Sequence, residues 1–154
     1  MSSGIEIAKP FITATSMVLK TMANVAPVAK NPYVKKGLVA EGDISAVIGI
    51  TGHYTGSISV SFSRPCAIAL VKAMLGDDIE DVLQDTRDAV GEITNMISGQ
   101  ARAGLAEMGI VLQGSTPTVI VGDFHTITHS PGVAVVAIPF VTKHGDFTLE
   151  FCLE

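Results

Sequence analysis

Four apolar residues near the start of the chain recur at helical spacing: Phe11, Ala14, Val18 and Met22. They fall on one side of a helix, and Pro10 fits only in or near a first turn because proline has no N–H to donate within a helix. The pattern predicts a helix from about Pro10 to Met22 whose apolar side packs against the rest of the protein.

Runs typical of β-strands follow this helix: PYVKKGLVAE, ISAVIGIT and GSISVSF. With turn residues between them, they predict a three-stranded meander over residues 32–62. The uncharged stretch from Ile44 to Ser63 is long enough to be considered as a membrane span, but its glycines, serines and histidine favour two strands joined by a turn. We therefore expect no membrane-spanning segment.

Two more helices are predicted in the middle of the chain. Arg64 and Pro65 open an apolar helical pattern that Gly76 stops. Asp85 begins a segment with the spacing of a capped N-terminus, and the longest helical pattern of the chain runs from there to about Met108.

The pattern changes to that of β-strands after residue 117. Four runs separated by turn residues predict strands: TVIVG, FHTITH, GVAVVAIPFV and DFTLEFCLE. The order of elements predicts an α/β (α+β) protein in which helices cover an antiparallel-rich mixed sheet, built from two helix-plus-meander halves. ITATSMVL and EITNMISG can be laid over each other, but too few residues agree to decide whether the halves arose by duplication. We expect residues 1–154 to form a single domain.

Composition narrows the classes of function. Apolar residues make up 47% of the chain and charged residues 16%, so the sequence can fill a buried core and is not disordered. Fifteen acidic and ten basic residues give a net charge of −5, and the basic residues are scattered, which argues against a nucleic-acid partner. So few charges indicate a further covered surface, most simply in a homo-oligomer.

The cysteines and the first residues indicate the compartment. Cys66 and Cys152 lie far apart in apolar contexts, and residues 1–10 lack the basic region and apolar core of a signal peptide. We expect a reduced, cytoplasmic protein in which Cys66 is a buried packing residue.

Two of the four histidines, His125 and His129, are four residues apart. On a helix this spacing suits a metal, but along the predicted FHTITH strand it separates the residues by about 13 Å. We therefore expect no metal site in the chain.

The longest predicted helix has an apolar stripe and a separate polar side. The stripe consists of Val90, Ile93, Ile97, Ala101, Gly104 and Leu105. Asp88, Glu92, Asn95 and Gly99 fall together on another side, which we expect to be exposed. Gly99 removes a side chain that would obstruct a partner, at a cost of up to about 1 kcal/mol relative to Ala. On spacing alone, an ordinary solvated helix face is the favoured interpretation, because polar residues are common on exposed helix faces.

The segment DAVGEITNMISGQ, from Asp88 to Gln100, resembles the signature of the CheC/CheX/FliY phosphatases of bacterial chemotaxis, and is most similar to that of CheX. The signature combines an acidic or small residue, Glu-x-x-Asn and a later proline, which here are Asp88, Glu92, Asn95 and Pro117. The resemblance extends over nearly the whole chain, and it favours a functional interpretation of the polar side that spacing alone does not supply.

The resemblance implies a phosphatase acting on the aspartyl phosphate of a CheY-type response regulator. Asn95 would position the attacking water, and Glu92 would dock on the regulator's active-site lysine. Asp88, Met96 and Gly99 would belong to the partner-binding surface. The resemblance implies no intrinsic cofactor or metal, because Mg²⁺ is supplied at the regulator's own active site.

The first helix lacks a second copy of the signature. Its matching positions are Thr13 and Ser16, so one active site per chain is implied. CheX relatives dimerise by joining sheets across chains, which implies a homodimer, and the GVAVVAIPFV strand is a candidate edge. The alternative function is a non-catalytic adaptor that binds a receiver domain or a flagellar switch component. Which regulator is the substrate, and whether the pathway controls motility, stays open.

Overall fold

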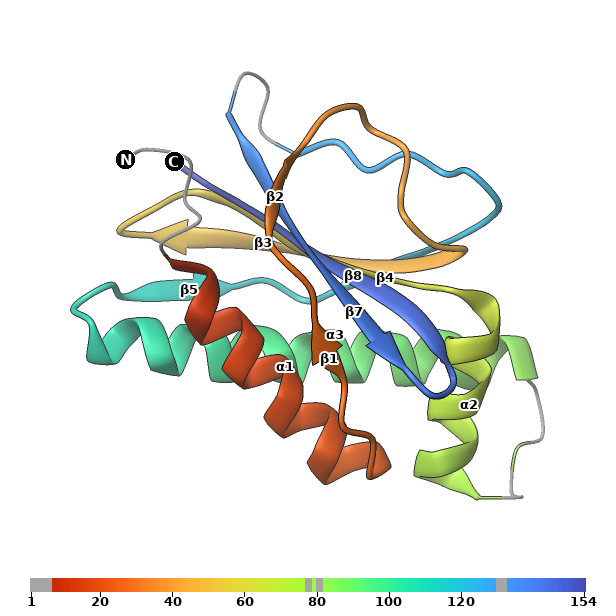
Figure 1. Cartoon of the computed structure of the whole chain (residues 1–154). Helices are drawn as coiled ribbons and strands as arrows, with labels where there is room; N and C mark the ends of the chain where they lie inside the picture. Colours follow the sequence, from red (N-terminus) through yellow and green to blue (C-terminus); the bar gives the residue numbers. More distant parts are fainter. Residues whose placement is uncertain (1–6, 77–78, 80–81, 130–132) are drawn as a thin grey trace.

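The computed structural model describes residues 7–76, 79, 82–129 and 133–154. Within these ranges, three helices lie on one face of an eight-stranded sheet (Figure 1). The elements in chain order are α1 (Ala8–Ala23), β1 (Val28–Ala29), β2 (Tyr33–Lys35), β3 (Ile44–Gly52), β4 (Gly56–Phe62), α2 (Arg64–Leu75), α3 (Val82–Glu107), β5 (Leu112–Gly114), β6 (Thr118–Val121), β7 (Val135–Thr142) and β8 (Gly145–Leu153).

The strands are ordered β1-β7-β8-β4-β3-β5, with β2 also beside β7 and β6 also beside β3. The described pairings are all antiparallel, which confirms the predicted fold class. Two hairpins, β3–β4 and β7–β8, form the centre, and β4 joins β8 between them. The last strands of the chain therefore complete a sheet that the first half begins.

The helix-facing side of the sheet holds the core. Alternate residues of the central strands point toward the helices and are buried, because side chains along a strand face opposite sides in turn. From α1, Phe11 stacks on Phe151 of β8 with ring centroids 4.4 Å apart. Ala14 and Val18 are buried on the same side of α1, so the predicted helix and its apolar side are confirmed.

The opposite side of the sheet is polar yet buried. Ser45, Ser59, Ser61 and Glu150 are each at most 1% exposed. Segments 36–43 and 122–129 are hydrogen-bonded to each other through the Ala40 and His125 backbone, and the side chains of His125 and His129 reach Ser45 and Glu150 of the sheet. Loops rather than helices therefore cover this face.

The predicted three-stranded meander is wrong in its first strand. Tyr33–Lys35 pairs with β7, whereas β3 has β4 on one side and β5 and β6 on the other. A local pattern identifies a strand but not its partner, because the partner is selected by which buried face the strand completes.

FHTITH is not a strand. Thr126 makes only an isolated bridge with Val39. Phe124 has a φ of 55°, a left-handed conformation that interrupts an extended chain, and His125 bonds the Gly122 carbonyl through Nδ1. His125 and His129 of this loop nevertheless reach the sheet, where their side chains hydrogen-bond Ser45 and Ser57.

The longest helix begins at Val82, three residues before the predicted Asp85 start. Asp85 lies in the first turn, where a carboxylate interacts favourably with the positive end of the helix dipole. The residue predicted to cap the helix is therefore already inside it. Residues 80 and 81, directly before Val82, lie outside the described ranges. The predicted candidate edge is also wrong, because β7 has β8 on one side and β1 and β2 on the other.

Candidate functional site

The candidate site lies on the outer side of α3. The helix buries one side against the sheet, β5, β6 and the other two helices, and that side includes Val90, Ile93, Ile97, Ala101 and Leu105. Asp88, Glu92 and Asn95 are exposed on the other side. Glu92 and Asn95 are one turn apart, a spacing at which Cβ atoms stand about 5–6 Å from each other. The predicted exposure of the pair is confirmed.

Neither Glu92 nor Asn95 has a hydrogen-bond or ion-pair partner among the residues that the structure describes. Asp88 differs, because Gln84 donates a hydrogen bond from Nε2 to its Oδ1 at 2.9 Å. The carboxylate of Glu92 and the amide of Asn95 are therefore available to a partner, while Asp88 is held by the turn before it.

Pro117 closes one side of the site. A depression of about 380 Å³ is lined by Arg87, Asp88, Gly91, Glu92, Asn95, Thr116, Pro117 and Val119. The four residues of the sequence signature therefore surround one hollow, although Pro117 is far from the others in the chain. This arrangement follows from the β6–β3 pairing, which carries residues 118–121 alongside α3.

The two glycines of this part of α3 have different environments. A Cβ on Gly91 would stand 3.4 Å from Val119 Cγ2 and 3.9 Å from Pro117 Cγ, which are ordinary van der Waals distances, so position 91 faces β6 and Pro117 without requiring glycine. A Cβ on Gly99 would meet only Arg102 Nη2, at 3.9 Å. Packing does not require glycine at position 99. The glycine leaves no side chain protruding from the outer face of α3 at this position.

Met96 is half-buried and packs against the core. Core filling therefore explains this residue at least in part, and its contact with a partner stays a prediction. On α1, Thr13 is exposed and Ser16 half-buried, and neither supplies a carboxylate or an amide.

Arg87 and Thr116 also line the depression, although neither belongs to the signature. Arg87 supplies its only cation among the described residues. Arg87 directly precedes Asp88 of the signature, so its place beside the site could have been predicted from the sequence. Thr116 is brought there by the loop before β6.

The remaining candidates have structural partners. His125 hydrogen-bonds Ser45 through Nε2, whereas His129 bonds Ser57 and lies 3.2 Å from a Glu150 oxygen. Burial raises the pKa of the Cys66 thiol to about 11, so it is a thiol rather than a reactive thiolate at neutral pH. Among the described residues, no three His, Cys, Asp or Glu side chains cluster as metal ligands, and no helix is long and apolar enough to cross a membrane.

An antiparallel sheet with helices on one face, shared with solved CheX and CheC-like proteins, places the chain in the CheC-like class. A family model described as chemotaxis phosphatase CheX matches residues 44–141. The chain belongs to the CheX family.

Known relatives agree with this placement. CheX from Desulfovibrio desulfuricans is 68% identical, with a TM-score of 0.93 over 97% of this chain and 100% of that chain. CheX from Vibrio vulnificus is 37% identical, with a TM-score of 0.88 over 97% and 99%. The CheY-P phosphatase CheX of Thermotoga maritima is 28% identical over 117 residues, which are 75% of this chain and 76% of that protein.

Proposed function

We propose that this chain hydrolyses the aspartyl phosphate of a CheY-type response regulator and so terminates a chemotaxis signal. Family membership and the activity in the name of the Thermotoga relative support the reaction. The observation that carries it is the Glu92–Asn95 pair, exposed beside Pro117 and without an internal partner in the described part of the chain.

Asn95 positions the attacking water. An acyl phosphate is already a reactive phosphoryl donor, so the phosphatase needs to place a water in line with the bond that breaks. The amide of Asn95 donates and accepts hydrogen bonds at once, which suits that task. The water oxygen bonds to phosphorus, the aspartyl oxygen leaves as a carboxylate, and inorganic phosphate is released. Ordering the water contributes about 3 kcal/mol, roughly a hundredfold in rate.

Glu92 docks the helix on the regulator. Its free carboxylate pairs with the lysine of the receiver's active site and so brings Asn95 into register, one helical turn further along α3. Asp88, Met96 and Gly99 form the surrounding contact surface. The Mg²⁺ ion belongs to the receiver, and this chain contributes side chains that complete the site around it.

A homodimer completes the proposal. The outer edge of β1 and β2 carries exposed apolar side chains, namely Val28, Tyr33 and Val34, and Leu38 and Val39 follow in the chain. An exposed apolar sheet edge favours pairing with a second copy. Sedimentation of the wild type and of Val34→Lys measures whether this edge holds two copies together, and we expect the variant to be monomeric. We expect the protein to act in the cytoplasm.

The test is loss of label from a radiolabelled phospho-receiver of the same organism. Wild type is expected to accelerate the loss well beyond the receiver's own rate, and Asn95→Ala is expected to leave that rate unchanged. An adaptor would bind the receiver and leave the rate unchanged in wild type as well, which would contradict the proposed reaction.

A further inference from the structure

Arg87 is the one arginine without a partner in the part of the chain that the structure describes. The chain contains three arginines, Arg64, Arg87 and Arg102. Arg102 donates a hydrogen bond from Nε to Ser98 Oγ at 3.2 Å, and Nη2 of Arg64 lies 3.7 Å from Asp123 Oδ1. Arg87 is half-buried, yet no hydrogen bond or ion pair with another described residue engages its guanidinium. Its donors and its charge are therefore available to a group outside the chain.

This free cation lies in the candidate site. Arg87, Gly91 and Asn95 follow one another at one-turn intervals along α3, and all three line the depression beside Pro117. Because Gly91 carries no side chain, no side chain of this row stands between Arg87 and Asn95. The free guanidinium and the amide that holds the water therefore share one hollow.

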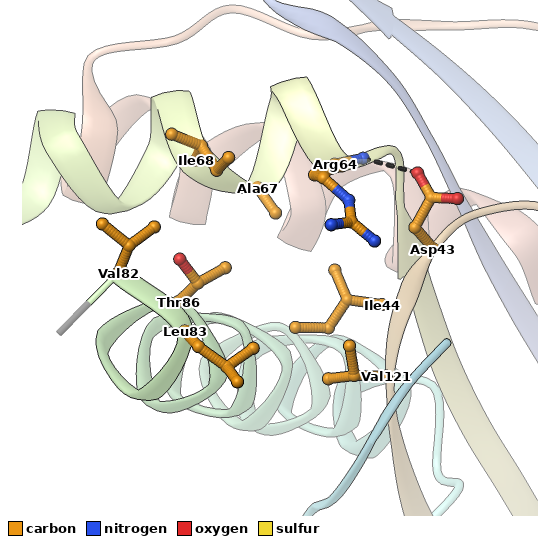
Figure 2. A pocket seen from close by; sticks show the side chains of 9 residues that line it. All are labelled: Asp43, Ile44, Arg64, Ala67, Ile68, Val82, Leu83, Thr86 and Val121. Carbon is orange, nitrogen blue, oxygen red and sulfur yellow. Dashed lines mark hydrogen bonds between the residues drawn. The ribbon is translucent and has the colours of Figure 1, made fainter. Parts of the chain in front are cut away.

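The surface of α3 changes character at Arg87. In the turn before it, Val82, Leu83 and Thr86 line a separate, largely apolar hollow of about 240 Å³ between α2, α3 and β6 (Figure 2). From Arg87 onward the outer face carries charge as far as Glu92. Arg87 is thus the cation at the N-terminal boundary of the charged part of the helix.

Charge complementarity favours an acidic counterpart for Arg87. Under the proposed function, the facing surface of the receiver holds Mg²⁺ with carboxylate oxygens, and the aspartyl phosphate adds negative charge. This chain has a net charge of −5, and Asp88 and Glu92 place two carboxylates in the same depression. Like charges across an interface repel each other, and Arg87 is the only cation among the described lining residues that offsets this repulsion.

The position of Arg87 along α3 indicates which acidic group it meets. Arg87 precedes Asn95 by eight residues, or about 12 Å along the helix axis. Side chains of a helix lean toward its N-terminus, so the guanidinium leads away from the phosphorus that the water held by Asn95 attacks. A planar guanidinium also matches a carboxylate with two parallel hydrogen bonds. These features favour a carboxylate at the edge of the receiver's site over the phosphoryl group itself.

We propose that Arg87 determines specificity at this site by pairing with a carboxylate beside the receiver's phosphorylated aspartate, while Glu92 pairs with the receiver's lysine. The two opposite charges are five residues apart, or about 7.5 Å along the axis. They fix the direction in which α3 crosses the receiver, because the reversed direction would bring like charges together. The inference rests on the proposed function, since it assigns a further contact to the same partner. Arg87 contributes to affinity and orientation, whereas Asn95 contributes to the chemical step.

Arg87→Gln tests this contact by removing the charge. We expect its KM for the phosphorylated receiver to rise by about fivefold or more, and its kcat to stay within about threefold of wild type. Arg87→Lys restores the charge without the planar fork and should recover part of the loss. Added salt should raise the KM of wild type more than that of Arg87→Gln, because the variant lacks the ion pair that salt screens.

Lys72→Gln is the matched control. It removes one positive charge from an exposed position of α2 outside the depression, so its KM should stay within about twofold of wild type. Urea unfolding verifies that the variants fold, and the unfolding midpoint of Arg87→Gln should match wild type because Arg87 has no partner among the described residues.

Receiver variants identify the counterpart of Arg87. Carboxylates beside the phosphorylated aspartate that do not bind Mg²⁺ are changed to amides one at a time. One of these changes should raise the KM of wild type and have no further effect on Arg87→Gln, which is the behaviour of a coupled pair.

A rise in KM below about fivefold, or one matched by Lys72→Gln, would overturn the role of Arg87 and leave the phosphatase assignment intact. A fall in kcat beyond about threefold would place the guanidinium on the reacting phosphoryl group and contradict the carboxylate contact. Receiver variants that all act additively with Arg87→Gln would contradict it as well. A wild type without activity on the receiver would overturn the proposed function and this inference with it.

Discussion

Lys35 and Glu150 form an ion pair inside the protein, with Nζ 2.7 Å from Oε2 and side chains only 5% and 1% exposed. His129 approaches the other carboxylate oxygen, and Lys35 also donates to the Val39 carbonyl. Burial by itself would raise the pKa of Glu150, but hydrogen bonds from His129 and Lys35 hold it below its usual value. These contacts connect β8 to two other parts of the chain, namely β2 and the loop that carries His129.

Glu150→Gln is expected to destabilise the protein by about 3 kcal/mol or more at neutral pH, because it leaves the Lys35 ammonium buried without its counter-charge. Adding Lys35→Met should recover at least half of that loss, since no unpaired charge then remains. Urea unfolding of the two single variants and the double variant measures the coupling. Additive effects would mean that the pair does not act as a unit.

The same cluster predicts a dependence on acid. A carboxyl whose pKa is lowered in the folded state stabilises the protein above its unfolded pKa, and this stabilisation is lost as the pH falls through the folded value. The stability difference between wild type and Glu150→Gln should therefore shrink as the pH drops below the usual carboxyl value of 4.5. A difference that grows in acid would contradict this prediction.

Gly99→Leu separates stability from function on α3. The free space at position 99 and the better helix propensity of leucine predict a free energy of unfolding that is unchanged or higher by up to about 1 kcal/mol. Receiver dephosphorylation should nevertheless fall by about tenfold, because the new side chain stands where the partner approaches. Gln100→Leu, exposed on another side of α3, is the control and should keep full activity. Full activity of Gly99→Leu would remove Gly99 from the contact surface.

Periodic segments could be predicted well from the sequence, because their burial is decided locally. The apolar side of α1, the α2 boundaries with Gly76 just past the end, and the exposed side of α3 all follow from spacing within one element. The exposure of Glu92 and Asn95 was readable for the same reason. Their role required the resemblance to a family, since spacing alone favours an ordinary solvated face.

Long-range relationships could not be predicted. The pairing of Tyr33–Lys35 with β7 and the loop conformation of residues 124–129 depend on a buried polar face that neither segment reveals alone. Glu150 lies within an apolar strand, and its partners Lys35 and His129 come from two other parts of the chain. The apolar pocket beside Thr86 likewise joins α2, α3 and β6, so no single segment carried its pattern.

Asn95→Ala should abolish phosphatase activity while keeping receiver affinity within about tenfold of wild type, because the amide acts on the water and contributes little to docking. Glu92→Lys should weaken affinity and activity together, because it places a positive charge opposite the receiver's lysine. Binding to the beryllofluoride-loaded receiver and single-turnover rates measure the two effects separately. Retention of more than about a third of the wild-type rate by Asn95→Ala would exclude water positioning by that amide.

The described residues hold no cluster of metal-ligand side chains, and Glu92 and Asn95 by themselves provide neither a nucleophile nor a phosphate pocket. We expect the purified protein to leave p-nitrophenyl phosphate intact, because this ester brings no acidic pocket, lysine or Mg²⁺ for the two residues to complete. Chelation of Mg²⁺ should stop receiver dephosphorylation without changing the unfolding midpoint of this chain alone. Metal analysis and the generic assay are run on the same preparation. Stoichiometric zinc, manganese or iron together with turnover of the ester would place the chemistry in this chain and contradict a site shared with the receiver.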